Sequence, residues 1–566
     1  MSCKAVHLAL GSVIVSITCG CAADRAYREL PVSEYREKMM AGWVGKMVGC
    51  AWGAPVEFKF QQKIVPPASM PAWSDQFVND SSANDDLYVQ MTFMESLDKY
   101  GLDVTQRQAG IDWANSPYGL CHANKAGRDN LRNGIAPPDS GHPKFNAHAD
   151  DIDYQIEADF AGLLSPGLPN LCIAMGEKFG RFMNYGDGVY GGQWVAAMYA
   201  EAFFESDPVK IVEAGLRCIP KGSQYHEAIS DVLAWYRADP DNWEKTWQLV
   251  EDKYEHNPAY RRFSCNKKGD IFNIDAKLNG AYIAIGILYG HGDLDQTIII
   301  STRCGQDSDC NPGNAAGVMF TTIPYSKLPE RYTKSLDQDR RFQGTSMTPR
   351  RLFAATEKMA RQAVVKAGGR VTRDAAGREV FMIPVQTPRP GKLQQCWNPG
   401  TVANSLFTAA EKAQIKPPQQ APHESTHVDL SAAVSEFAPG WMVKNCGAEM
   451  SPGIRDELGK KSVLVTHPLS ETMPCVLGRR VDILPDKKTT LHLVVGHHPE
   501  GDWLLRVTAD RELLRKVIGK ETAPDGWTSI DVDLSGYAGQ IITLQLINAA
   551  NGWSYEAAYW AKIEIE

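Results

Sequence analysis

The sequence predicts a multidomain protein, with an all-α domain followed by a C-terminal β-sandwich of the jelly-roll kind. Residues 33–367 show mostly helical periodicity and no alternation of strands with helices. Residues 384–428 are dense in Pro and Gln and lack periodicity, whereas residues 429–566 contain short β-type runs separated by turn residues. A chain of 566 residues with 43% hydrophobic residues can form such domains and a large core.

The helical prediction rests on four segments, of which the first two carry apolar residues at three- and four-residue intervals. They are YREKMMAGWVGKMVGCAWG, DLYVQMTFMESLDKYG, GGQWVAAMYAEAFF and AKLNGAYIAIGILYG. In the second segment, one helix face carries Leu87, Met91, Met94 and Leu97. The last two segments are rich in Ala and Gly, which predicts close helix packing inside a large bundle.

The β-sandwich prediction rests on seven runs punctuated by turns such as PDKK and APDG. They are SVLVTH, CVLGRRVDIL, TLHLVVGHH, DWLLRVTA, WTSIDVDL, QIITLQLIN and YWAKIEIE. The preceding segment, 384–428, is interpreted as an interdomain linker or an extended strap. Four tryptophans of the β region either stack on sugar rings or belong to the core and edges: Trp503, Trp527, Trp553 and Trp560.

The N-terminus predicts a signal peptide over residues 1–23. A short basic start, MSCK, precedes the apolar run AVHLALGSVIVSI and the small residues of TCGCAAD. The apolar run is short for a membrane span, and no other segment is long and apolar enough to be one. We therefore expect an exported protein that is periplasmic, at the cell surface or extracellular. A lipid anchor at Cys21 stays open, although the residues before it fit a lipoprotein signal poorly.

The charge and the cysteines exclude two classes of protein. A formal charge of −8, a pI near 6.0 and the lack of a basic block argue against a nucleic-acid binder. The 13 cysteines include no CxxC pair, which argues against a zinc ribbon. The composition fits an enzyme that acts on small or sugar-like molecules.

Four places in the helical region concentrate carboxylates. They are Glu57 in WGAPVEF, Asp85 and Asp86 in ANDDLYV, Asp150, Asp151 and Asp153 in HADDIDYQIE, and Asp307 and Asp309 in RCGQDSDCNPG. Neighbouring buried carboxylates repel one another, so they need a cation or a compensating helix N-terminus. Helix capping explains any one of these motifs taken alone. Together they offer the oxygen ligands that Mg²⁺ requires.

A Gly-rich stretch, NYGDGVYGGQW at 184–194, has two interpretations. Its backbone can approach a phosphate or sugar closely, or it can form a tight connection between packed helices. Three histidines between the acidic motifs, His122, His142 and His148, either line a cleft or simply occupy loops.

These motifs carry a resemblance to a known family. GWVGKMVGCAWGAPVEF, NDDLYVQMTFMESL, GDGVYGG and CGQDSDCNPGNAAGVM, in that order, resemble the ADP-ribosylglycohydrolase (dinitrogenase-reductase-activating glycohydrolase-like) superfamily over roughly residues 34–330. The resemblance implies an all-α fold with a binuclear Mg²⁺ or Mn²⁺ centre that hydrolyses a bond at the anomeric carbon of a ribose. It does not cover the linker or the β region.

The resemblance implies roles for particular residues. The metal ligands would be Asn84, Asp85, Asp86, Asp307, Asp309 and Cys310, and the catalytic residues Glu57, Asp85 and Asp86. The ribose and diphosphate would lie on Gly186, Asp187, Gly188, Tyr190, Gly191 and Gly192. Asp150, Asp151 and Asp153 would form a second acidic wall toward the substrate, or a capped helix start.

Three departures separate the sequence from the family pattern. Asn84 keeps a carbonyl oxygen where the family has a hydroxyl, whereas Cys310 places a soft sulfur that Mg²⁺ disfavours. After the Gly-rich stretch the chain has Gly-Gln-Trp-Val-Ala in place of Asn-Gly-x-Met-Arg, which weakens the case for ADP-ribose itself.

The sequence thus predicts an exported, metal-dependent glycohydrolase of a small-molecule or glycan substrate. The leader and the added β-sandwich, of the galactose-binding-like kind, favour an extracellular glycan or furanoside over an ADP-ribosylated protein. A non-catalytic sugar-binding protein that retains the fold and metal site is the alternative, and purely structural carboxylates are a third reading.

Overall fold

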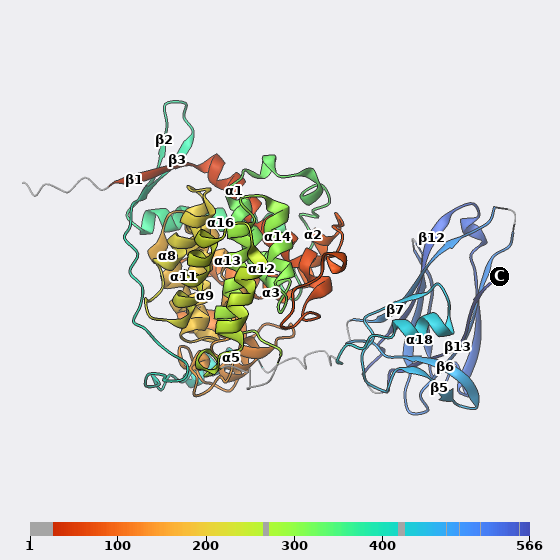
Figure 1. The fold of residues 1–566 in the computed structure, drawn as a ribbon. Coiled ribbons are helices and arrows are strands. Elements are labelled where there is room, and N and C mark those ends of the chain that lie inside the picture. The colour runs from red at the N-terminus through yellow and green to blue at the C-terminus, as the bar shows by residue number, and fades with distance from the viewer. Residues whose placement is uncertain are drawn as a thin grey trace, which may run out of the picture. The chain divides into compact units, whose positions relative to one another are not determined.

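The computed structural model describes residues 26–263, 271–416, 425–470, 473–485, 487–509, 511–553 and 555–566. The predicted signal peptide, including Cys21, lies outside these residues. The chain divides into two compact units, Met1–Pro417 and Pro418–Glu566. The first is mainly helical and the second consists of two antiparallel sheets, which confirms the predicted fold class (Figure 1).

The helical unit is built around a large apolar core. All four predicted helical segments are helices: α1, α3, α9 and α13. The helices run as α1 (Val32–Gly53), α2 (Phe77–Asp80), α3 (Asp85–Tyr100), α4 (Gln106–Ala114), α5 (His122–Arg132), α6 (Asp153–Ile156), α7 (Asp159–Leu163), α8 (Pro169–Lys178), α9 (Asp187–Ala202), α10 (Pro208–Leu216), α11 (Gln224–Ala238), α12 (Trp243–Val250), α13 (Ala276–Tyr289), α14 (Leu294–Arg303), α15 (Cys310–Thr321), α16 (Pro349–Lys366) and α17 (Ala409–Lys412).

Glycines on α1 allow α15 to pack unusually close to it. A Cβ on Gly49 would lie 2.2 Å from the carbonyl oxygen of Pro312, and a Cβ on Gly53 would lie 1.8 Å from that of Ser308. Side chains at these two positions would therefore force the helices apart. The close approach brings the end of α1, just before Glu57, against the start of α15.

A small antiparallel sheet in the helical unit was not predicted. Its strands are β1 (Tyr27–Pro31), β2 (Arg370–Arg373) and β3 (Glu379–Pro384), in the order β1-β3-β2. The central strand β3 alternates poorly, and β1 precedes α1 directly, so neither had a clear strand pattern. The sheet joins the two ends of the helical sequence.

Residues 385–416 lie along the helical unit as a strap. Arg107 pairs with Glu411, with Nη2 and Oε2 2.6 Å apart. The hydroxyl of Tyr190 donates to the carbonyl oxygen of Lys392 at 3.0 Å and accepts from the backbone N–H of Gln394 at 2.8 Å. Such contacts at both ends fix this segment to the helices.

The C-terminal unit is a sandwich of two five-stranded sheets, in the orders β10-β9-β12-β7-β4 and β11-β8-β13-β6-β5. Its elements are α18 (Ser431–Phe437), β4 (Met442–Lys444), β5 (Gly453–Glu457), β6 (Lys460–Thr466), β7 (Cys475–Asp482), β8 (Thr490–His497), β9 (Trp503–Thr508), β10 (Glu512–Ile518), β11 (Trp527–Asp533), β12 (Ile541–Ala549) and β13 (Ala558–Ile565). All seven predicted runs are strands, whereas β4, β5 and β10 were missed. Trp503 and Trp560 are fully buried against each other, so they belong to the core.

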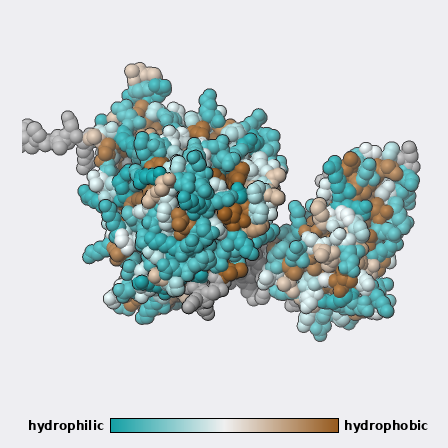
Figure 2. Space-filling model, in the orientation of Figure 1, coloured by the Kyte–Doolittle hydropathy of each residue, from teal (hydrophilic) through white to brown (hydrophobic). Residues whose placement is uncertain are grey.

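Hydropathy varies over one face of the surface (Figure 2) and along the helices. The visible face of the helical unit is mostly hydrophilic, with hydrophobic residues in small separate groups (Figure 2). Among the described residues, no helix combines the length and the apolar character needed to cross a membrane.

Candidate functional site

One cavity in the helical unit gathers carboxylates from four separate segments. Its volume is about 110 Å³, enough for several waters or ions. The acidic side chains that line it are Glu57, Asp85, Asp86, Asp153, Asp307 and Asp309. The structure thus brings together most of the acidic residues that the sequence analysis selected.

Two helix N-termini position this cluster. Asn84 caps α3 by accepting the backbone N–H of Asp86 at 2.9 Å, and Asp309 caps α15 by accepting that of Cys310 at 2.8 Å. The Nδ2 of Asn84 donates to Oδ2 of Asp309 at 2.7 Å and so joins the two helix starts. The sequence analysis assigned the carbonyl oxygen of Asn84 to a metal ion. In the structure that oxygen caps α3, and the amide positions Asp309.

Lys46 is a site residue that the sequence analysis missed. Its buried Nζ donates to Oδ1 of Asp86 at 2.6 Å and to the carbonyl oxygen of Ile156 at 2.8 Å. Burial disfavours the ammonium, but the carboxylates of Asp159 and Asp86 outweigh it and raise the pKa of Lys46, so the side chain stays charged. A lone charge inside the apolar run MMAGWVGKMVGCAWGAPV was the signal that could have revealed a buried, paired lysine.

The carboxylates of the cavity raise one another's pKa values. The charge of Asp309, followed by partial desolvation within the cavity, raises the pKa of Glu57 to about 9, and water still reaches this side chain. Burial and the same charge raise the pKa of Asp85 to about 6 and that of Asp307 well above its usual range. Like charges crowd here, so the site takes up protons unless cations neutralise it.

The donor set fits a hard divalent cation. Carboxylate oxygens are the ligands that Mg²⁺ and Mn²⁺ prefer, and four aspartates offer them at the two helix starts: Asp85, Asp86, Asp307 and Asp309. Cys310 lies beside them, with its sulfur within 4.8 Å of oxygens of Asp307 and Asp309. Burial raises the pKa of the Cys310 thiol well above its usual range, so the sulfur stays protonated and suits Mg²⁺ poorly.

Asp153 extends the cavity from the start of α6. Its Oδ1 accepts the backbone N–H of Asn124 at 2.7 Å, and burial raises its pKa to about 7. Its buried Oδ2 has no hydrogen-bond partner among the described residues, and the same is true of Oε2 of Glu157, whose other oxygen accepts from the Asn124 side chain. Since Asp153 lines the cavity, its Oδ2 is available to a ligand there. Sequence reasoning missed Asn124, which stands outside every acidic motif, and also Glu157, the last residue of HADDIDYQIE, because it selected only the aspartates of that motif.

The three aspartates of HADDIDYQIE do not form one acidic wall. Asp153 lines the cavity, whereas Oδ2 of the buried Asp151 pairs with Nδ1 of His148 at 2.8 Å. Asp150 lies in a separate group with Asp275 and Lys277. Burial and the Asp275 carboxylate raise the pKa of Asp150, whereas the Lys277 ammonium lowers it. Asp150 and Asp151 lie in the turn before α6 and Asp153 begins that helix, so the three side chains meet different partners, which their spacing could not show.

The Gly-rich stretch does not reach the acidic cavity in the described structure. A Cβ on Gly188 would lie 2.6 Å from the Ala149 carbonyl oxygen, and a Cβ on Gly192 would lie 2.2 Å from the Tyr154 ring. Glycine at these positions permits close packing of α9, which is the second interpretation given above. Of the proposed substrate contacts, Gly186 and Tyr190 meet the strap, Gly191 packs on Gln155 and Tyr225, and Asp187 is buried near Lys277 and Asp275.

We expect the metal-free protein to lose stability as the pH rises. Because the pKa of Glu57 is about 9 in the folded state and near 4.5 ordinarily, the folded state holds a proton that the unfolded state releases. The contribution of this proton to the stability of the folded state is complete below about pH 4.5 and is lost as the pH rises toward 9. Thermal melting in chelator from pH 5 to 9 should show this fall, and Glu57→Gln should flatten it. Parallel curves for the two proteins would contradict the assignment.

Comparisons with known proteins identify a family for the helical unit. The sequence model described as ADP-ribosylglycohydrolase matches residues 31–363, and no curated protein matches the chain. A solved structure titled "ADP-ribosylglycohydrolase-related protein complex" is 14% identical, with a TM-score of 0.36, and the match covers 58% of this chain and 99% of that one. An apo cyclase from Fischerella sp. is 17% identical, with a TM-score of 0.15, over 22% of this chain and 71% of that one. Since the family match spans more than half of the sequence, the chain belongs to the ADP-ribosylglycohydrolase family.

Proposed function

We propose that the chain is a divalent-metal-dependent hydrolase that cleaves an N- or O-glycosidic bond at an anomeric carbon. The substrate would be a glycan, a furanoside or an ADP-ribosyl-type compound, and the metal a binuclear Mg²⁺ or Mn²⁺ centre. Family membership supports hydrolysis of glycosyl bonds in general. The observation that carries the finer proposal is one cavity where carboxylates from the start of α3, from the turn before α15 and from Glu57, after α1, crowd together.

The side chains of the cavity suit the two proton transfers of glycoside hydrolysis. Bound divalent cations would hold sugar hydroxyls and lower the pKa of water. Glu57, once nearby positive charge lowers its pKa, can accept a proton from the attacking water. Asp153, with a pKa of about 7 and one oxygen without a described partner, can protonate the leaving group. Lys46 holds Asp86 in place from the buried side.

Export and sugar binding by the β unit belong to the same proposal. The leader pattern of residues 1–23 supports an exported protein, and a glycan outside the cell is then the favoured substrate. Trp503 and Trp560 are buried in the core, so sugar stacking by the β unit would depend on the partly exposed Trp527 or on other surface residues.

Turnover of a broad panel tests the proposal. Full-length protein is assayed on aryl furanosides, aryl pyranosides and ADP-ribosylated peptides, with Mg²⁺, Mn²⁺ or chelator. We expect hydrolysis of at least one substrate class that requires the metal and disappears in Glu57→Gln. The non-catalytic alternative predicts sugar binding by calorimetry without turnover under any divalent metal, and that result would overturn the hydrolase.

A further inference from the structure

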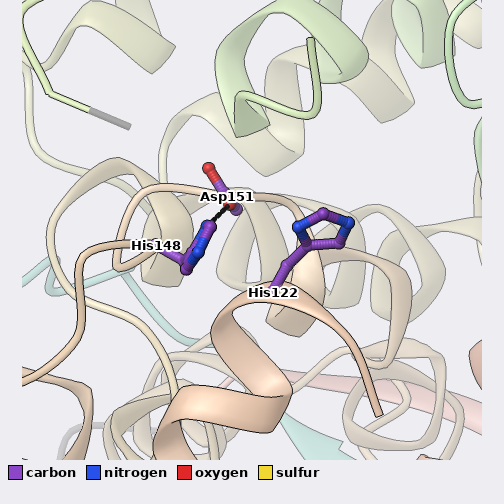
Figure 3. Close-up of side chains that lie close together, drawn as sticks. All are labelled: His122, His148 and Asp151. Atoms are coloured by element: carbon purple, nitrogen blue, oxygen red, sulfur yellow. Dashed lines mark hydrogen bonds and ion pairs between the residues drawn. The ribbon is translucent and has the colours of Figure 1, made fainter. Parts of the chain in front are cut away.

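A second group of metal-ligand side chains lies at the rim of the acidic cavity. His122 stands at the start of α5, and His148 and Asp151 come from the loop before α6 (Figure 3). One ligand atom from each of the three lies within 4.8 Å of the others, and Nδ1 of His148 lies 2.8 Å from Oδ2 of Asp151. The residue types differ from those of the carboxylate cavity, because two of the three offer nitrogen.

Hydrogen bonds to the backbone hold this group together. Asn146 accepts the backbone N–H of His148 at 2.9 Å, and its amide donates to the carbonyl oxygen of Ala123, next to His122, at 3.0 Å. The side chain of Asn184 donates to the carbonyl oxygen of Asp151 at 2.8 Å. The two segments that supply the three ligands are therefore tied to each other and to the core.

The three side chains are buried on one side and accessible on the other, as a metal site with one open coordination position requires. The Asp151 side chain is fully buried, whereas the His148 side chain is 30% exposed. His122 is half-buried, with its ring 5.5 Å from that of Phe272, and it also lines the carboxylate cavity. Protein therefore encloses one side of the group, and the other side opens toward the cavity.

The protonation states of the histidines suit metal binding. Burial, followed by the neighbouring His148, lowers the pKa of His122 to about 4. Burial also lowers the pKa of His148, although Asp153 opposes this shift. Both imidazoles are therefore neutral near pH 7, and a neutral imidazole is the form that binds a metal.

We propose that His122, His148 and Asp151 bind a transition-metal ion of the Zn²⁺ or Co²⁺ type, in a site separate from the carboxylate centre. Two imidazoles and one carboxylate suit such borderline ions better than Mg²⁺, and three protein ligands leave a position for water or a ligand oxygen. Bonds of about 2.0–2.2 Å in a tetrahedron need ligand atoms roughly 3.3 Å apart. Nδ1 of His148 and Oδ2 of Asp151, 2.8 Å apart, would therefore separate around the ion, and any wider spacing in the group, which reaches at most 4.8 Å, would shorten. Metal binding at this site does not depend on hydrolytic activity at the carboxylate centre.

Cobalt binding tests the site. Co²⁺ is titrated into the full-length, tag-free protein in excess Mg²⁺, which competes for the oxygen ligands, and visible absorption reports the bound ion. We expect one equivalent to bind, and His122→Ala and His148→Ala each to weaken its binding by at least about 100-fold, as loss of a direct ligand should exceed the effect of an outer partner. His226→Ala, a half-buried histidine on α11 that contacts Ser230, is the matched control and should bind normally.

Two further measurements keep the test decisive. Asp307→Asn impairs the carboxylate centre and should leave the Co²⁺ signal unchanged, which separates this proposal from the proposed hydrolase. X-ray absorption of the zinc-loaded wild-type protein should show imidazole scattering, whether or not the variants fold. An all-oxygen shell, or Co²⁺ binding within about 3-fold of wild type in a folded His122→Ala/His148→Ala variant, would overturn the site.

Discussion

Replacing Asp307 with Asn is expected to abolish metal-dependent hydrolysis and to weaken Mg²⁺ binding by at least about 100-fold. The substitution keeps the shape of the side chain and removes one charge from the buried cavity. Loss of an outer partner of a metal ligand already costs 10–100-fold in affinity, so loss of a ligand itself should cost no less. Calorimetric titration with Mg²⁺ and Mn²⁺ measures the affinity, and the substrate identified from the panel measures the activity.

The same variant should be more stable than wild type in chelator. Burial and the charge of Asp309 disfavour an ionised Asp307, so without a cation the folded wild type must keep this carboxyl protonated, whereas the amide of Asn is neutral without binding a proton. Mg²⁺ should then raise the melting temperature of wild type but not of Asp307→Asn. Asp293→Asn, at the exposed cap of α14, changes the same charge and should alter neither property. A normal Mg²⁺ affinity in Asp307→Asn would remove Asp307 from the site.

The fold was predictable where local periodicity matches the final structure. The runs that became α3 and β8 carry their apolar residues on the face that is buried, so pattern and packing agree. β10 was missed because ELLRKVI is largely half-buried and does not alternate cleanly. The sheet of β1, β2 and β3 was missed because its strands come from opposite ends of the helical sequence, and their pairing depends on the whole bundle.

The site was predictable to the extent that its residues stand at helix starts. Asp85 and Asp309 begin α3 and α15, and short motifs reveal such positions. The side chains that hydrogen-bond to the site carboxylates or lie beside them come from segments outside these short motifs. Lys46 lies within the helix α1, and Asn124 and Glu157 meet only when α5 packs near α6. Neither a motif nor a spacing reports such contacts between distant segments.

Replacing Lys46 with Met is expected to destabilise the metal-free protein by about 3–5 kcal/mol, the cost of removing one partner of a buried ion pair. Met preserves most of the side-chain volume. The loss therefore reports the ammonium that bonds Asp86 and the Ile156 carbonyl oxygen and lies 3.6 Å from Asp159. Asp159 keeps hydrogen bonds from other side chains, so the uncompensated charge falls mainly on Asp86. Urea unfolding in chelator measures the free energy of unfolding.

Two comparisons show whether the missing charge of Lys46 causes the expected loss of stability. Lys125→Met removes an exposed pair with Asp129 and should cost less than about 1 kcal/mol. If divalent cations bind beside Asp86, Mg²⁺ should restore part of the stability of Lys46→Met, because positive charge returns to the same carboxylate. A loss in Lys46→Met as small as that of Lys125→Met would mean that Asp86 is protonated in the metal-free protein. Lys46 would then not be the charge that holds the cavity together before metal binds.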